Sequence, residues 1–133
     1  MEDRIAVTEL IAMHGHLIDA GALERLEELF TEDVVYDIAD FGFGAVRGVA
    51  GIRDAALALG EGNPVGHHVT NIVLTEVGVD RVRAVSKGLG VMADGTCGSV
   101  TYKDVIIRGE YGWRISRRTV LARRAPLGRT PTP

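Results

Sequence analysis

The chain has 133 residues, of which 46% are hydrophobic, and this fits one domain built around one core. Its 15 basic and 18 acidic residues give a net charge of −3, so we expect no nucleic-acid partner. The single cysteine, Cys97, excludes an intrachain disulfide or a zinc quartet and suits a reducing compartment. Without a signal-peptide pattern, or an apolar run near the roughly 20 residues of a membrane helix, the sequence predicts a cytoplasmic protein with no membrane partner.

The first part of the chain predicts two helices. Apolar residues from Val7 to Ile18 recur at helical spacing, and Asp19-Ala20-Gly21 ends this pattern with Gly21 as a C-cap. A second, shorter helix is expected over residues 23–30, and residues 31–33 are expected to break it. These two segments would supply part of the cover for a sheet.

A short strand and a third helix are expected next. The strand covers residues 34–38, and the glycine-rich segment 42–48 predicts a turn and another short strand. This segment lacks the Lys-Ser/Thr pair of a phosphate-binding loop. The third helix is expected over about residues 49–59, and a loop over residues 60–64 follows it.

The second half of the chain predicts four long antiparallel strands, at about 67–77, 81–93, 98–108 and 112–123, with glycines in the later breaks that suit hairpins. Residues 125–133 contain three prolines and are expected to form a flexible tail, so the single domain would cover residues 1–124. We predict an α+β fold in which a curved, mixed or antiparallel sheet wraps around three N-terminal helices as a cone. Its apolar interior would be a natural small-molecule site.

Two adjacent histidines open the first long strand. Successive side chains of a strand point to opposite faces, so one of His67 and His68 should face the covered side. An imidazole in an apolar pocket is a ready proton carrier near neutral pH. Asp19, at the C-terminal end of a helix, opposes the helix dipole, so another group such as a histidine is expected to hold it there.

The remaining histidines leave alternatives open. His14 lies in the apolar stripe of the first helix, where it is either a core residue or a catalytic one. Metal binding by His14, His16, His67, His68 and Asp19 would need ligands that converge. Because His67 and His68 point apart on a strand, no metal site is predicted.

Five segments carry recognisable motifs, at residues 17–21, 29–34, 67–71, 101–105 and 112–118. In this order they resemble the motifs of the SnoaL-like branch of the NTF2-like superfamily, which also contains proteins of the ketosteroid isomerase and scytalone dehydratase types. The resemblance extends from about residue 3 to residue 122. It implies the same cone-shaped α+β fold.

The resemblance also implies a set of site residues. Dehydratase-like members use an Asp–His pair, assisted by a tyrosine on the first helix and an arginine or asparagine on the sheet. The resemblance places the aspartate at Asp19, the base at His67 and the arginine at Arg118, with Arg117 as the alternative if a bulge shifts the register. The tyrosine position holds His14, so the substrate or the reaction can differ from those of the dehydratases.

These residues lead to the hypothesis of a lyase or isomerase, of the dehydratase, isomerase or cyclase kind, that needs no cofactor. His67 would remove a proton next to the carbonyl of a small hydrophobic molecule, with His14, Arg118 or Tyr102 hydrogen-bonded to the enolate oxygen. The residues expected to bind the substrate are Tyr36, Phe43, Leu57, Leu89, Met92 and Tyr102. The alternative function is a non-catalytic ligand holder or a dimeric interaction module. A homodimer is expected because apolar residues recur on the outer face of the sheet.

Overall fold

The computed structural model describes residues 2–128. Its helical segments are α1 (Glu2–Asp19), η1 (Leu23–Glu28), η2 (Ala39–Phe41), α2 (Gly48–Leu59), η3 (Gly60–Gly62) and η4 (Pro126–Gly128), where η denotes a 3₁₀ helix. Its strands are β1 (Phe30–Asp37), β2 (Ala45–Arg47), β3 (Gly66–Val77), β4 (Arg81–Val91), β5 (Cys97–Gly109) and β6 (Gly112–Arg123).

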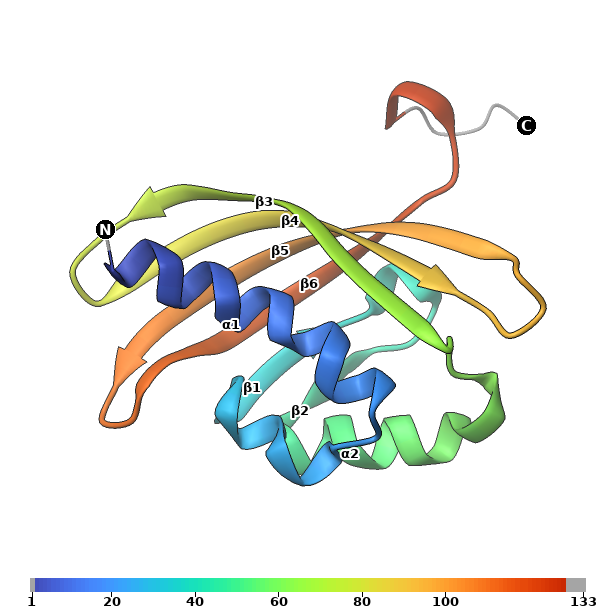
Figure 1. Cartoon of the computed structure of the whole chain (residues 1–133), viewed down its shortest axis with the longest axis horizontal. Coiled ribbons are helices and arrows are strands. Elements are labelled where there is room, and N and C mark those ends of the chain that lie inside the picture. Colours follow the sequence, from blue (N-terminus) through green and yellow to red (C-terminus); the bar gives the residue numbers. More distant parts are fainter. Residues whose placement is uncertain (1, 129–133) are drawn as a thin grey trace.

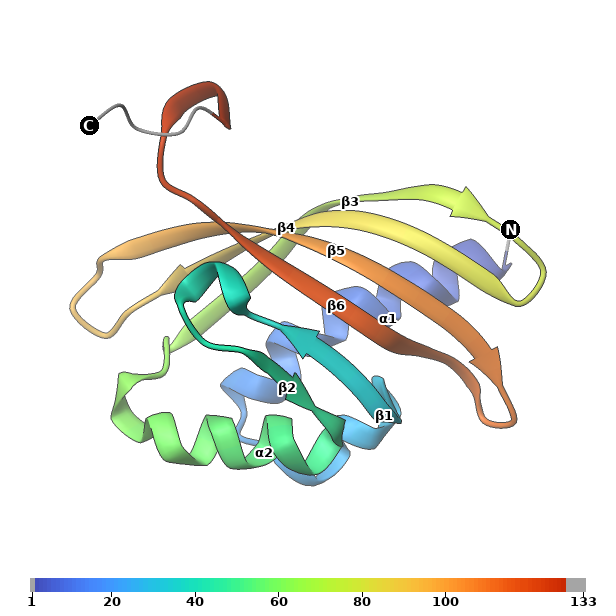
Figure 2. The same cartoon turned by 180° about the vertical axis from the view of Figure 1, so that it is seen from behind.

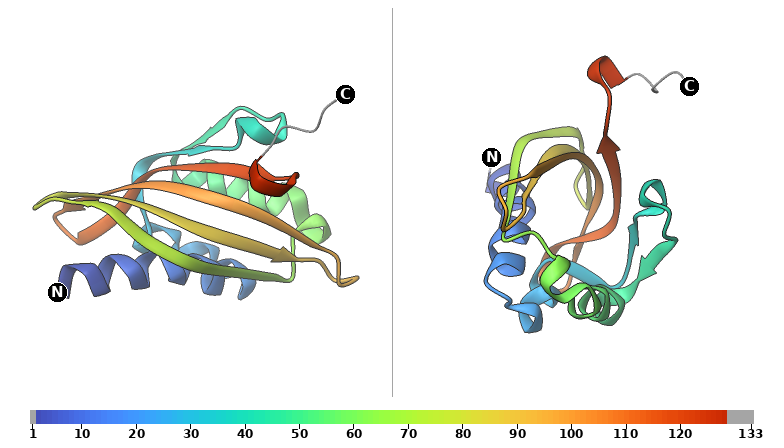
Figure 3. Two further views of the ribbon diagram at one scale, coloured as in Figure 1. Left: turned by 90° about the horizontal axis from the view of Figure 1, so that it is seen from above. Right: turned by 90° about the vertical axis from the view of Figure 1, so that its right-hand side faces the viewer.

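The six strands form one mixed sheet in the order β2-β1-β6-β5-β4-β3. Strand β1 runs parallel to β6, and the other neighbouring pairs are antiparallel. The sheet curls without closing, and α1 lies against its concave side, in front of β3 to β6 (Figure 1). Figure 2 shows β1 and β2 beside β6, with α2 along them, and the right-hand view of Figure 3 shows the curl. The predicted α+β architecture is confirmed.

Helix α1 ends where the sequence predicts, in a Schellman motif. The Ala22 N–H donates to the Leu17 carbonyl at 2.9 Å, and the Gly21 N–H donates to the Ile18 carbonyl at 3.0 Å. Gly21 has a φ of 67°, a conformation that glycine adopts without steric cost. This cap stops the helix directly after Asp19 and so sets the position of that carboxylate.

The boundary between the second helix and the first strand differs from the prediction. The helix is a 3₁₀ helix that stops at Glu28, and β1 begins at Phe30, so residues 31–33 belong to the strand. Pairing with β6 explains this, because Phe30 lies opposite Ile115, and the Ile115 N–H donates to the Leu29 carbonyl at 2.7 Å. A long-range hydrogen bond of this kind is invisible to local helical periodicity.

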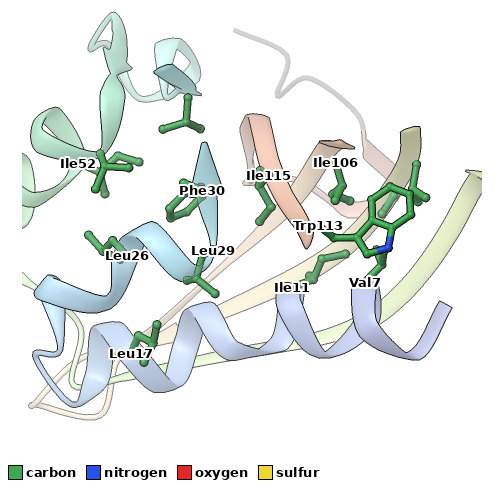
Figure 4. Packing of buried hydrophobic residues seen from close by; sticks show 14 residues of the cluster. Val7, Ile11, Leu17, Leu26, Leu29, Phe30, Ile52, Ile106, Trp113 and Ile115 are labelled. Atoms are coloured by element: carbon green, nitrogen blue, oxygen red, sulfur yellow. The ribbon is translucent and has the colours of Figure 1, made fainter. Parts of the chain in front are cut away.

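The hydrophobic core fills the space between α1 and the sheet (Figure 4). It includes Val7 and Ile11 of α1 and Ile106, Trp113 and Ile115 of the sheet, each at most 6% exposed. At the N-terminal end of α1, the Trp113 indole N–H donates to Asp3 at 3.3 Å. The core therefore extends along the concave side from the N-terminal half of α1 to α2, and it fixes α1 across the strands.

Two sequence predictions concern the ends of the chain and membranes. The domain boundary at residue 124 stays a prediction, and residues 129–133 of the expected tail lie outside the described residues. Within residues 2–128, none of the helices combines the length and apolar character required to cross a bilayer.

Candidate active site

Asp19 and His67 meet at the edge of the concave side, as the sequence predicts. Asp19 Oδ1 lies 2.7 Å from His67 Nδ1, and the two carboxylate oxygens also accept from the His67 backbone N–H at 3.1 and 3.0 Å. Since an ionised carboxylate only accepts hydrogen bonds, this contact in a neutral imidazole requires the proton on Nδ1 and leaves the lone pair on Nε2. The pair is therefore held in the tautomer that leaves Nε2 free to act as a base.

A glycine of α1 makes this contact possible. Gly15 lies one helical turn before Asp19, and a Cβ atom there would collide with the backbone carbonyl of His67. The absence of a side chain lets β3 approach the helix backbone directly. Gly15 therefore sets the separation at which the Asp19 carboxylate reaches the backbone nitrogen and the ring Nδ1 of His67.

The histidine doublet divides between the two faces of β3. His67 lines a half-open cavity, whereas His68 is exposed on the other face. His16 is also exposed, on the outer side of α1. Of the four histidines, only His14 and His67 reach the cavity.

His14 is buried beside His67, with ring centroids 6.2 Å apart, and it also lies edge-on to Phe30 and Tyr102 at 6.1 Å. Burial lowers the pKa of His14 well below 6.5, and the charge of Arg118 and the neighbouring His67 lower it further. His14 is therefore neutral at physiological pH. Its Nδ1 has no hydrogen-bond partner within the described chain.

Arg118 faces inward, and its neighbour Arg117 lies on the outer surface, paired with Asp37 at 2.9 Å. The register between β5 and β6 shifts between the Ile106–Ile115 and Val105–Arg117 pairs, which marks a bulge at Ser116. In a regular strand, alternation from the buried Ile115 would aim Arg117 inward, so the bulge is what buries Arg118, whereas the sequence analysis expected a bulge to select Arg117. The bulge thus decides between the two arginines left open by the sequence.

Arg118 is held by a residue that the sequence analysis did not select. Its Nε and Nη2 donate to the two oxygens of Asp104 at 2.7 and 2.9 Å, and both side chains are fully buried. Burial by itself lowers the pKa of Arg118, but the Asp104 carboxylate outweighs it and keeps the pKa above the ordinary value. The guanidinium also lies over the Tyr102 ring, 4.3 Å from its centroid.

Two tyrosines complete the polar part of the interior. Tyr36 lines the cavity with His14 and His67, and it lies opposite Arg118 in the β1–β6 pairing. Burial is the largest cause that raises the pKa of Tyr36, and it also raises the pKa of Tyr102. Both phenols therefore keep their protons at neutral pH and can donate hydrogen bonds.

The half-open cavity has a volume of about 200 Å³, which is room for a small guest. Its polar side is formed by His14, Tyr36 and His67, and its apolar side includes Val46 and Ile52. A larger hollow of about 840 Å³, which Asp19 lines, shares Ile18, Ala56 and Asn63 with the cavity. The side chains of His14, Tyr36 and His67 converge on the smaller cavity.

The structure does not bring every residue of the predicted binding set to this cavity. Phe43 is 66% exposed in the β1–β2 connection, and Leu57 is 65% exposed and lines the outer hollow. Leu89 is partly exposed on the opposite face of β4 from Gly88, whose inner side meets the Tyr102 ring. Met92 lies past the end of β4 and lines none of the hollows described above.

Gly15, Gly88 and Asp104 were not predicted as site residues, although the sequence contains an indication for each of them. Gly15 and Gly88 stand inside a helix and a strand, where glycine costs about 1 kcal/mol relative to alanine and so needs a reason such as close packing. Asp104 shares the strand parity of Tyr102 and Ile106, which places a carboxylate on an inner face. Within residues 2–128, no group of three or more His, Cys, Asp or Glu side chains could hold a metal ion.

Comparison with known families places this geometry in context. A model of the SnoaL-like domain matches residues 1–119. The chain belongs to the SnoaL-like family. This match confirms the resemblance inferred from the sequence motifs. A search of curated proteins finds no match to this SnoaL-like protein.

Solved structures show the same fold. An NTF2-like protein with a cystatin-like fold from Novosphingobium aromaticivorans is 31% identical, with 91% of this chain and 82% of that chain covered and a TM-score of 0.75. A protein of unknown function from Mycobacterium tuberculosis is 24% identical, with 95% and 80% covered and a TM-score of 0.82. A candidate scytalone dehydratase from N. aromaticivorans is 22% identical, with 96% and 95% covered and a TM-score of 0.75.

Proposed function

We propose that this SnoaL-like protein is a lyase or isomerase that moves a proton on a small, hydrophobic carbonyl compound and needs no cofactor for this step. One observation carries the proposal: the Asp19 carboxylate accepts from both the ring Nδ1 and the backbone N–H of His67. A residue held at two points has a fixed orientation. Its Nε2 lone pair is then available beside the cavity that His67 lines.

The first step is proton abstraction. Nε2 of His67 removes a proton from the carbon next to the carbonyl, and the electron pair of that C–H bond moves onto the carbonyl oxygen as an enolate. The imidazolium that forms is stabilised by Asp19, the role that an aspartate has in other Asp–His pairs. Neutral His14 and the protonated Tyr36 line the same cavity and are the candidate hydrogen-bond donors to the enolate oxygen.

The second step returns the proton. In a dehydration, the enolate reforms the carbonyl and expels a β-hydroxyl, which leaves as water after it takes the proton from His67. In an isomerisation, the substrate carries a β,γ double bond, so abstraction of the α-proton gives a dienolate; the γ-carbon takes the same proton from His67, and the double bond moves to the α,β position as the carbonyl reforms. The fold-level similarity to a candidate scytalone dehydratase supports the first alternative.

The test is exchange of α-protons in D₂O, followed by ¹H NMR on a panel of small ketones and β-hydroxyketones that includes acetophenone. His67→Ala should lower the exchange rate by about 10²–10⁴-fold, because the general base is gone. Asp19→Asn should lower it while most of the ligand affinity remains.

His68→Ala is the matched control, because the neighbouring histidine is exposed on the other face of β3. It should exchange at the wild-type rate. If none of the ketones shows exchange that depends on His67, while some of them bind, the protein is a ligand holder and the catalytic proposal is wrong.

A further inference from the structure

The buried pair of Asp104 and Arg118 lies directly behind the cavity wall. Apart from the neutral His14, these are the only acidic or basic residues that are buried within residues 2–128. Arg118 lies opposite Tyr36 and stacks on Tyr102, whose ring centroid is 6.1 Å from that of His14. A guest between His14, Tyr36 and His67 would therefore be one side chain away from the guanidinium.

The negative charge of Asp104 compensates the positive charge of Arg118 behind the cavity wall. Asp104 binds Arg118 through two parallel hydrogen bonds, so the wall behind the cavity carries a cation and an anion that sum to zero. Charges inside a protein are screened much less than in water, and their effect extends over several ångströms. An uncompensated Arg118 would attract anions into the cavity, and the compensated one does not.

Fold stability alone does not account for such a pair. Well-packed hydrophobic residues of similar volume often serve as well as a buried ion pair or better, because two charges must be taken out of water. The Arg118 guanidinium also keeps one atom, Nη1, without a partner in the described chain. A pair with this geometry beside a cavity points to a role in what the cavity accepts.

We propose that Asp104 determines the charge specificity of the site: by neutralising Arg118, it makes the cavity select uncharged carbonyl compounds over carboxylates of the same shape. This rests on the proposed function, because it names the substrate class of the same cavity. Asp104 acts through Arg118 and does not itself line the cavity. It is a specificity-determining residue and not a catalytic one.

The test compares a neutral and an anionic probe of the same size, acetophenone and benzoate, by isothermal titration calorimetry. The wild-type protein should bind acetophenone at least tenfold more tightly than benzoate. Asp104→Asn removes the compensating charge and should tighten benzoate binding at least tenfold, with acetophenone changed less than threefold. A purely structural role for Asp104 would weaken both probes together. Absence of a benzoate gain in Asp104→Asn overturns the proposal.

Two controls isolate the charge of Arg118. Asp37→Asn frees the exposed Arg117 on the opposite face of the sheet and should change neither probe. The double variant Asp104→Asn/Arg118→Gln carries no buried cation and should show no benzoate gain. If it gains benzoate as the single variant does, the charge is not the cause and the proposal is wrong.

A second measurement applies if Asp104→Asn folds poorly, since an unpaired buried cation is destabilising. Benzoate would then replace the missing carboxylate, so it should raise the melting temperature of the variant, or restore its far-ultraviolet circular dichroism, and leave the wild type unchanged. Failure of this rescue overturns the proposal. If the wild-type protein shows no exchange that depends on His67, the proposed function is overturned, whereas a missing benzoate effect overturns only the role of Asp104.

Discussion

His14 illustrates how one residue links the site to the stability of the fold. Its side chain is buried and neutral, and burial is the main reason that its pKa is lowered. In the unfolded chain the same imidazole titrates near its ordinary pKa of 6.5. Below that pH the unfolded state binds a proton that the folded state excludes, so acid favours unfolding.

We therefore expect the free energy of unfolding to be constant above about pH 6.5 as far as His14 is concerned, and to fall below it. The loss from this residue should reach at most about 1.4 kcal/mol per pH unit until the lowered folded pKa is reached. Urea unfolding of the wild type and of His14→Gln between about pH 7 and pH 5 measures it. The slope of the free energy of unfolding against pH should be smaller in His14→Gln than in the wild type.

His16→Gln serves as the control, because His16 is exposed on the same helix. It should keep the wild-type slope. Equal slopes in the wild type and His14→Gln would show that another group causes the acid sensitivity.

At this scale the sequence was informative about residues with distinctive chemistry. Asp19 at a helix end and His67 at the start of a strand could be named as a pair, through the helix dipole and the family resemblance. The partnership of Asp104 and Arg118 could not be named, because it depends on which residues of β5 and β6 lie opposite each other. That register includes a bulge, which no local pattern revealed.

At the level of elements, the contact between α1 and β3 depends on Gly15. An alanine there would place its Cβ against the His67 carbonyl, and backbone cannot move aside as a flexible side chain can. Gly15→Ala should therefore push β3 from the helix and break the bonds from His67 to Asp19. We expect a loss of about 1–3 kcal/mol in the free energy of unfolding and at least a tenfold slower proton exchange.

Two measurements separate this effect from general destabilisation. The hydrogen-bonded His67 Nδ1–H should give a downfield ¹H NMR resonance in the wild type and lose it in Gly15→Ala. Gly98→Ala is the control, since an added Cβ there meets nothing within 4 Å. A Gly15→Ala protein that retains the resonance would contradict this account of the helix–strand contact.

Strands β4 to β6 also depend on close contacts between side chains and backbone that the periodicity of apolar residues does not predict. Gly88 of β4 leaves room for the Tyr102 ring, and that ring supports the Arg118 guanidinium. Strand positions were predicted within a few residues because apolar and polar residues alternate. The start of β1 was missed because its first residues are ordered by β6 and not by their own sequence.

For the whole molecule, the outer face of the sheet predicts association. Val73 is 55% exposed and Leu89 is 38% exposed there, while the neighbouring Ile72 and Leu74 pack against the core. Apolar groups on an accessible sheet face favour burial against a second copy. We expect size-exclusion chromatography with light scattering to give twice the mass of one chain.

Leu89→Asp should shift this mass towards that of a single chain, because it places a charge in the expected interface. Leu57→Asp, on α2 and away from the sheet face, should leave the mass unchanged. A wild-type protein with the mass of one chain at all concentrations would contradict the homodimer prediction.

The sequence by itself determined the fold class and the order of the elements, which follow from short-range physics: apolar periodicity, helix capping and the alternation of side chains along a strand. It also predicted the pairing of Asp19 with His67, and that prediction rested on the helix dipole at Asp19 and on the family resemblance. The tertiary structure alone decided which arginine faces inward, that Asp104 cancels its charge, and that Gly15 brings helix and strand together. These depend on register, bulges and backbone separation, which are set by contacts between residues far apart in the chain.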